Sequence, residues 1–162
     1  MNTLKQGLLI ACLMAFSAEP TWAGEKRYFL SVTYKEECGS CHIAYPPALL
    51  SAASWRAVMA GLSRHFGSDA SLDPVPAGEI ARYLDAGAAT GKKHDAIDEN
   101  GQPSLRITDG PWFRREHRDG HEGIVAGVWK RPSVKTPANC SACHQNAEQG
   151  SYSEHEIVIP RS

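Results

Sequence analysis

The chain has 162 residues, of which 42% are hydrophobic, and its 17 Lys and Arg nearly balance its 18 Asp and Glu, for a formal net charge of -1. This length suits one domain or two very small ones. The near-neutral balance provides neither the basic field expected of a nucleic-acid-binding protein nor a polybasic membrane patch.

The first 23 residues have the pattern of a secretory signal peptide. Lys5 precedes an apolar run over residues 7–18, and small residues lead to Ala23, so we expect cleavage near Ala23 and a periplasmic protein. An uncleaved membrane span is disfavoured because the run is far shorter than the roughly 20 residues such a helix needs. Lipidation at Cys12 is a weaker alternative, since the apolar stretch continues past this cysteine.

The exported part is poor in large aliphatic and aromatic core residues. From Gly24 onward, 139 residues contain only 24 Leu, Ile, Val and Phe, which is below the usual level for a chain with a full hydrophobic core. We therefore expect something other than side chains to fill part of the interior.

Residues 24–88 are predicted to form one helical unit. Apolar residues recur at helical spacing from Ser54 to Phe66 and place Trp55 and His65 on one face. A second helix is predicted over residues 77–88.

Residues 89–101 are polar and have the composition of a linker. Residues 102–162 then show little periodicity, except for two predicted helical turns at 111–118 that begin with Pro111. The sequence therefore predicts a mainly α protein, with signal 1–23, units 24–88 and 102–162, and a linker between these units.

Two Cys-x-x-Cys-His pentapeptides, at 38–42 and 140–144, carry the clearest chemical signal. This is the attachment signature of c-type haem, in which the thiols add to the two haem vinyl groups and the histidine becomes an axial iron ligand. We expect two covalent haems, which also explain the shortage of aliphatic residues. The predicted attachment residues are Cys38, Cys41, Cys140 and Cys143, and the predicted proximal ligands are His42 and His144.

Two other uses of the four cysteines are weaker. One zinc ion could bind all four, but zinc does not explain the histidine that follows each pair. Disulfides suit an exported protein, yet a Cys-x-x-Cys bridge closes a very small loop and constrains the unfolded chain little.

The sixth iron ligands must come from a small set of side chains. Met59 is the only methionine beyond the signal, so at most one haem can have His/Met ligation. For the first haem we favour His65, on the predicted apolar helix face, with Met59 as its rival. The other reading of His65 is a core histidine bonded to backbone.

For the second haem we favour His117, which follows Phe113 by one helical turn. His121, in a glycine-flanked loop, is the alternative ligand. His94 lies in the polar linker and His155 between two glutamates, and both are expected to be exposed and unligated.

Seven stretches of the mature sequence carry a family resemblance, at residues 38–47, 54–56, 61–67, 106–108, 111–117, 139–144 and 157–160. Through them the sequence resembles the bacterial dihaem cytochrome c family over nearly its whole mature length. The resemblance implies a minimal class I cytochrome c-like domain followed by a haem-wrapped domain with little regular secondary structure. It also implies bis-histidine ligation, with the distal histidines at His65 and His117.

These observations predict an electron carrier rather than an enzyme. Two six-coordinate haems leave no open iron, and imidazole on both faces favours a low potential, so we expect no small-molecule substrate. The family resemblance implies redox partners, namely an oxygen-binding monohaem cytochrome, often with a membrane cytochrome b. The alternative is a dihaem peroxidase-like or small-gas-binding protein with one five-coordinate haem.

Overall fold

The computed structural model describes residues 27–162, so the predicted signal peptide lies outside the described residues. Within them the chain forms four α-helices and no sheet, only isolated β-bridges, which confirms the prediction of a mainly α protein. The helices are α1 (Val32–Cys38), α2 (Ala52–Ala60), α3 (Pro74–Gly87) and α4 (Pro111–Glu116).

Short 3-10 turns connect the helices and make up most of the remaining regular structure. They are η1 (Pro47–Leu49), η2 (Leu62–Arg64), η3 (Lys92–His94), η4 (Ile107–Asp109), η5 (Val128–Lys130), η6 (Cys140–Ala142), η7 (Ala147–Gln149) and η8 (Glu154–Glu156). After α4, only such turns and loops occur up to residue 162.

Serine side chains start the first two helices. The hydroxyl of Ser31 accepts a hydrogen bond from the Tyr34 backbone N–H, and that of Ser51 accepts one from Ser54, so each satisfies an N–H group that the first helical turn leaves unpaired. Helix α3 begins three residues before the predicted start because Pro74 suits the first turn.

Helix α2 is shorter than predicted. It ends at Ala60 with Gly61 as its C-cap, and η2 follows. Phe66 and Gly67 then have φ values of +49° and +94°, a left-handed pair that reverses the chain. His65 is therefore presented by a tight turn and not by the helix face that the periodicity predicted.

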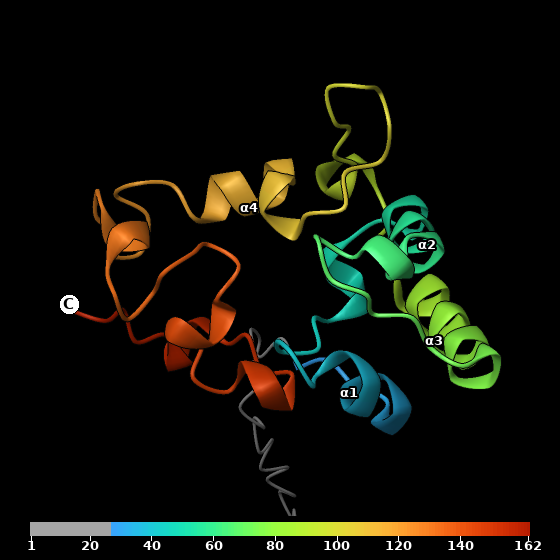
Figure 1. Cartoon of the computed structure of the whole chain (residues 1–162). Helices are drawn as coiled ribbons and strands as arrows, with labels where there is room; N and C mark the ends of the chain where they lie inside the picture. Colours follow the sequence, from blue (N-terminus) through green and yellow to red (C-terminus); the bar gives the residue numbers. More distant parts are fainter. Residues whose placement is uncertain (1–26) are drawn as a thin grey trace, which may run out of the picture.

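The main hydrophobic core lies among α1, α2 and α3. Tyr34, Trp55, Val58, Ile80 and Leu84 are all buried there, and full burial of a side chain such as Leu84 is worth about 1.5–3 kcal/mol. The Trp55 indole N–H also donates to the Pro47 carbonyl at 2.7 Å, which fastens η1 to α2. Figure 1 shows these helices grouped together, with α4 and the C-terminal segment beside them.

Hydrogen bonds between distant parts of the chain join the two pentapeptide segments. The Tyr45 hydroxyl donates to the Ala138 carbonyl at 2.8 Å, across 93 positions of sequence. The Tyr28 backbone N–H donates to the Gly150 carbonyl at 2.8 Å. In Figure 1 the red C-terminal segment accordingly lies beside α1. These bonds place the segments that precede and follow the two motifs next to each other.

Among residues 27–162, no helix has both the length and the apolar character required to cross a lipid bilayer.

Replacing Gly150 with alanine should strongly destabilise the protein. A Cβ at this position would lie 2.2 Å from the Tyr28 carbonyl oxygen, and the backbone φ is +78°. Gly91→Ala is the matched control, because its φ is +88° but no atom lies within 4 Å of the added Cβ. We expect denaturant unfolding to give a loss at least about 2 kcal/mol larger for Gly150→Ala. Equal losses would contradict the close approach of the two segments.

Tyr45→Phe should lower the free energy of unfolding by about 1 kcal/mol, because it removes a hydrogen bond that joins segments 93 positions apart. The Ala138 carbonyl keeps the bond from the Cys140 backbone N–H. Tyr83→Phe is the control, since it removes a similar bond, to the Phe29 carbonyl, at an exposed position. Denaturant titrations followed by far-ultraviolet circular dichroism compare the two variants. A smaller loss for Tyr45→Phe than for Tyr83→Phe would contradict the proposed role of this bond in joining the segments.

Candidate haem sites

The first candidate site pairs His42 with His65. Their ring centroids are 6.1 Å apart and the ring planes form an angle of 29°. His42 Nδ1 lies 2.7 Å from the Ile43 carbonyl oxygen. A carbonyl only accepts, so Nδ1 carries the proton and Nε2 keeps a lone pair for a metal. The Tyr45 ring stacks on His42 at 5.0 Å.

The turn after η2 brings His65 to this position. Partial burial, and then the neighbouring His42, lower the pKa of His65, which favours the neutral imidazole that a metal requires. The Phe66 ring lies edge-on to His65 at 4.8 Å, and the Arg106 guanidinium lies 4.5 Å above the Phe66 centroid. An aromatic ring and a cation thus support the turn that carries His65.

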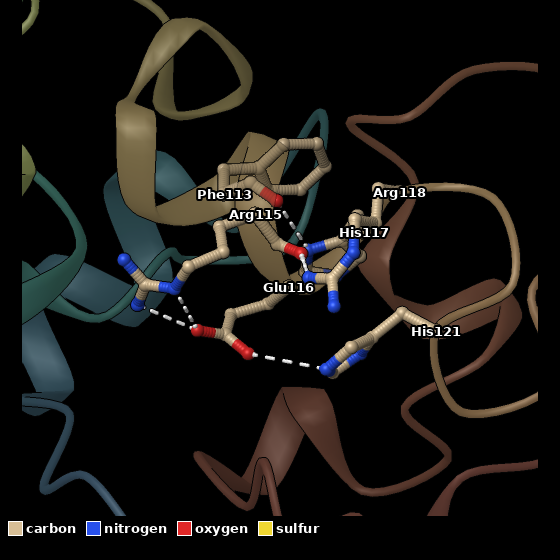
Figure 2. Close-up of polar contacts among 6 residues, drawn as sticks. All are labelled: Phe113, Arg115, Glu116, His117, Arg118 and His121. Atoms are coloured by element: carbon tan, nitrogen blue, oxygen red, sulfur yellow. Dashed lines mark hydrogen bonds and ion pairs between the residues drawn. The ribbon is translucent and has the colours of Figure 1, made fainter.

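The second candidate site pairs His117 with His144. Their ring centroids are 6.2 Å apart and the ring planes form an angle of 60°. His117 is the C-cap of α4, and its Nδ1 donates to the Phe113 carbonyl at 3.0 Å (Figure 2). The Phe113 ring stacks on the His117 ring at 4.0 Å. Burial lowers the pKa of His117, which favours the neutral imidazole here too.

His144 follows η6, and its backbone N–H donates to the Cys140 carbonyl at 2.8 Å. Burial, and then the nearby His117, lower the pKa of His144. The Tyr152 ring lies 5.2 Å from the His144 ring. Within the described residues, His144 Nδ1 is buried and has no hydrogen-bond partner.

The spacing of each histidine pair fits one metal ion between two imidazoles. A metal–nitrogen bond of about 2.0–2.1 Å, with the ring centre about 1.1 Å behind the nitrogen, places two such rings about 6.3 Å apart. The observed separations of 6.1 and 6.2 Å agree with this value. Both pentapeptide histidines therefore lie close to the distal histidines favoured from sequence, at separations that fit a shared ion.

The four predicted attachment cysteines differ in exposure, since Cys41 is exposed and the other three are partly buried. Burial raises the pKa of Cys38 and of Cys140 to about 11. In residues 27–162, no group of three or more His, Cys, Asp or Glu side chains is placed to hold a metal ion. This arrangement disfavours one zinc site built from all the cysteines, and disulfide pairing is not formed among them.

Two hollows border the pentapeptides. One, of about 310 Å³, is lined by Cys140, Cys143, His144 and His117 together with apolar and aromatic side chains, which is the lining that a porphyrin needs. The other, of about 820 Å³, has residues 39–45 on one side and residues 138–141 on the other. The two pentapeptides therefore border hollows that lie next to each other.

Of the two rival ligands, one packs against the helical core and the other lines the same hollow as His117. Met59 packs against the hydrophobic core of the helices. His121 lines the smaller hollow, where its Nε2 lies 3.7 Å from a Glu116 carboxylate oxygen (Figure 2). His94 is partly buried beside Trp112, with 5.5 Å between the ring centroids, so the expectation that it is exposed is wrong. His155 is exposed in η8.

Comparisons with known proteins agree with this geometry. Residues 34–152 match the family model described as "Dihaem cytochrome c". The chain has no match among curated protein sequences. Since the family match extends over both pentapeptides, it applies to both candidate sites and not to one half alone.

Solved dihaem cytochromes are similar over most of the chain. A crystal structure of DHC purified from Rhodobacter sphaeroides is 41% identical, with a TM-score of 0.61, over 77% of this chain and 99% of that one. The diheme cytochrome sb-DHC from Shewanella baltica OS155 is 38% identical, with a TM-score of 0.64, over 80% and 93%. From its sequence and these likenesses, the chain belongs to the dihaem cytochrome c family and carries two covalent c-type haems.

Proposed function

We propose that this protein is a low-potential electron relay in which histidines ligate both faces of each haem. In the first site, Cys38 and Cys41 hold the haem, and His42 and His65 are its ligands. The second site uses the second pentapeptide, with Cys140 and Cys143 for attachment, His144 as proximal ligand and His117 as distal ligand. The observation that carries the proposal is the pair of imidazole separations, 6.1 and 6.2 Å.

When bound, haem iron supplies one-electron transfer, and the chain sets its potential and access. His42 and His117 each donate the Nδ1 proton to a backbone carbonyl. This bond fixes the tautomer, orients the ring and makes Nε2 more basic. A more basic imidazole stabilises the oxidised iron, and with no thioether ligand from Met59 both potentials should be low.

We further propose that the chain has two haem-binding units, at 24–88 and 102–162, separated by the linker at 89–101. The buried core of α1, α2 and α3 supports the first unit. The second unit has one short helix and few buried side chains, so its haem would supply much of its interior. The signal pattern at 1–23 supports a periplasmic location.

A cytochrome of this family implies redox protein partners. We propose an oxygen-binding monohaem cytochrome as one partner and a membrane cytochrome b as another, on the basis of the family resemblance. Encounters for electron transfer are usually weak and brief. No small-molecule substrate is needed, because a haem ligated on both faces has no open position for one.

Carbon monoxide tests whether either iron is open. The reduced protein should show no rapid, stoichiometric spectral shift on addition of carbon monoxide. His65→Ala and His117→Ala should each open one iron and bind about one equivalent per chain. The controls Met59→Leu and His121→Ala should behave as the wild type, because these side chains are not ligands in the proposal.

A rapid shift in the wild-type protein would contradict the relay and favour the dihaem peroxidase-like or gas-binding alternative. Carbon monoxide binding by Met59→Leu, with none by His65→Ala, would instead identify Met59 as the distal ligand of the first haem. Carbon monoxide binding by His121→Ala, with none by His117→Ala, would identify His121 as the distal ligand of the second haem.

A further inference from the structure

We infer that the two haems are electronically different because their histidine planes cross at different angles, and that Phe113 is the positioning residue that fixes this angle at the second haem. The inference rests on the proposed bis-histidine ligation. The two sites have the same attachment motif and the same ligand types, so the ring angle would be the structural origin of their electronic difference.

The two ring pairs have nearly the same separation but different relative rotation. The planes of His42 and His65 form an angle of 29°, while those of His117 and His144 form an angle of 60°. The first pair is thus closer to parallel and the second closer to perpendicular. Separation alone would not distinguish the sites, since the values differ by only 0.1 Å.

Phe113 holds His117 at three points. Its carbonyl oxygen accepts hydrogen bonds from the His117 backbone N–H at 2.9 Å and from Nδ1 at 3.0 Å. Its ring lies 4.0 Å from the His117 ring, with only 10° between the two planes. Phe113 is buried, so its ring has little freedom to move. Rotation of the imidazole would break both the stacking and the Nδ1 bond.

The other neighbours of His117 limit rotation without competing for its proton. The Trp129 ring lies 6.2 Å away at 45°, and the Trp112 ring lies 6.3 Å away at 77°. Figure 2 shows the Glu116 carboxylate directed toward Arg115 and His121 instead of toward His117. The orientation of the His117 ring therefore depends mainly on Phe113.

At the first site, Tyr45 and Ile43 set the orientation of the proximal His42 ring. Tyr45 stacks on His42 with 24° between the planes, and the Ile43 carbonyl accepts from Nδ1. On the distal side, Phe66 meets His65 edge-on, at 68°. Among residues 27–162, none at this site repeats the parallel, hydrogen-bonded arrangement that Phe113 makes with His117 on the distal side.

The angle between axial imidazole planes acts on the iron d orbitals. Parallel planes direct π donation along one axis, so the two d orbitals that receive it differ most in energy. Planes that are nearly perpendicular donate along both axes and make these orbitals nearly equal. In low-spin ferric haem, the first case gives an electron paramagnetic resonance spectrum with three resolved g values, and the second gives one broad feature at low field.

The test is electron paramagnetic resonance of the oxidised protein with both haems attached, at liquid-helium temperature. The wild type should show one low-spin signal of each kind. Phe113→Leu keeps the accepting carbonyl but removes the ring, so it should shift the broad low-field signal and leave the resolved signal unchanged. Phe113→Tyr keeps the stacking ring and should preserve both signals. Phe66→Leu, the matched change beside His65, should leave the broad signal in place.

The outcomes separate this inference from the proposed function. Two resolved low-spin signals in the wild type would overturn the difference in angle while leaving bis-histidine ligation intact. A high-spin signal in the wild type would overturn the ligation itself. If Phe113→Leu takes up two haems and both signals stay unchanged, Phe113 is not the positioning residue. If Phe113→Leu does not take up two haems, Phe113→Tyr provides the test instead. Loss of the broad signal in Phe113→Tyr would then overturn the role of the stacked ring.

Discussion

The proposed bis-histidine ligation sets one geometric requirement, which is to hold two imidazoles about 6 Å apart on opposite sides of a haem, at two places in a short chain. The ring separations of 6.1 and 6.2 Å meet it at both places. From Gly24 onward the chain has few aliphatic residues, and its main hydrophobic core lies among α1, α2 and α3. After α4, short turns and loops make up the rest of the chain.

Different local devices meet this requirement at the two sites. At the first site, Gly61 ends α2 and the left-handed backbone of Phe66 and Gly67 turns His65 toward His42. At the second, α4 ends at His117 and its Phe113 carbonyl accepts from the ring. The bond from Tyr45 to Ala138 then joins the neighbourhoods of the two motifs. Local turns place the histidines, and long-range hydrogen bonds relate the sites to each other.

The sequence predicted the haem-attachment chemistry better than it predicted the course of the backbone. The attachment motifs and the short helix at Pro111 could be identified from spacing and composition, and the mainly helical fold is confirmed. His65 lies 6.1 Å from His42 between ring centroids, but the helix predicted to carry it ends at Ala60. Hydrophobic periodicity does not reveal that Gly61 caps the helix or that Phe66 has a left-handed backbone. The contact of Gly150 with Tyr28 arises from tertiary packing, which no local pattern encodes.

Near-infrared magnetic circular dichroism of the oxidised protein tests the central claim most directly. Its charge-transfer bands identify the axial ligand pair of each low-spin haem, and their intensity can be referred to the number of haems per chain. The account predicts bis-imidazole bands from two haems and no band of any other ligand pair. A histidine–methionine band, or a bis-imidazole intensity that accounts for only one of the two haems, would contradict it.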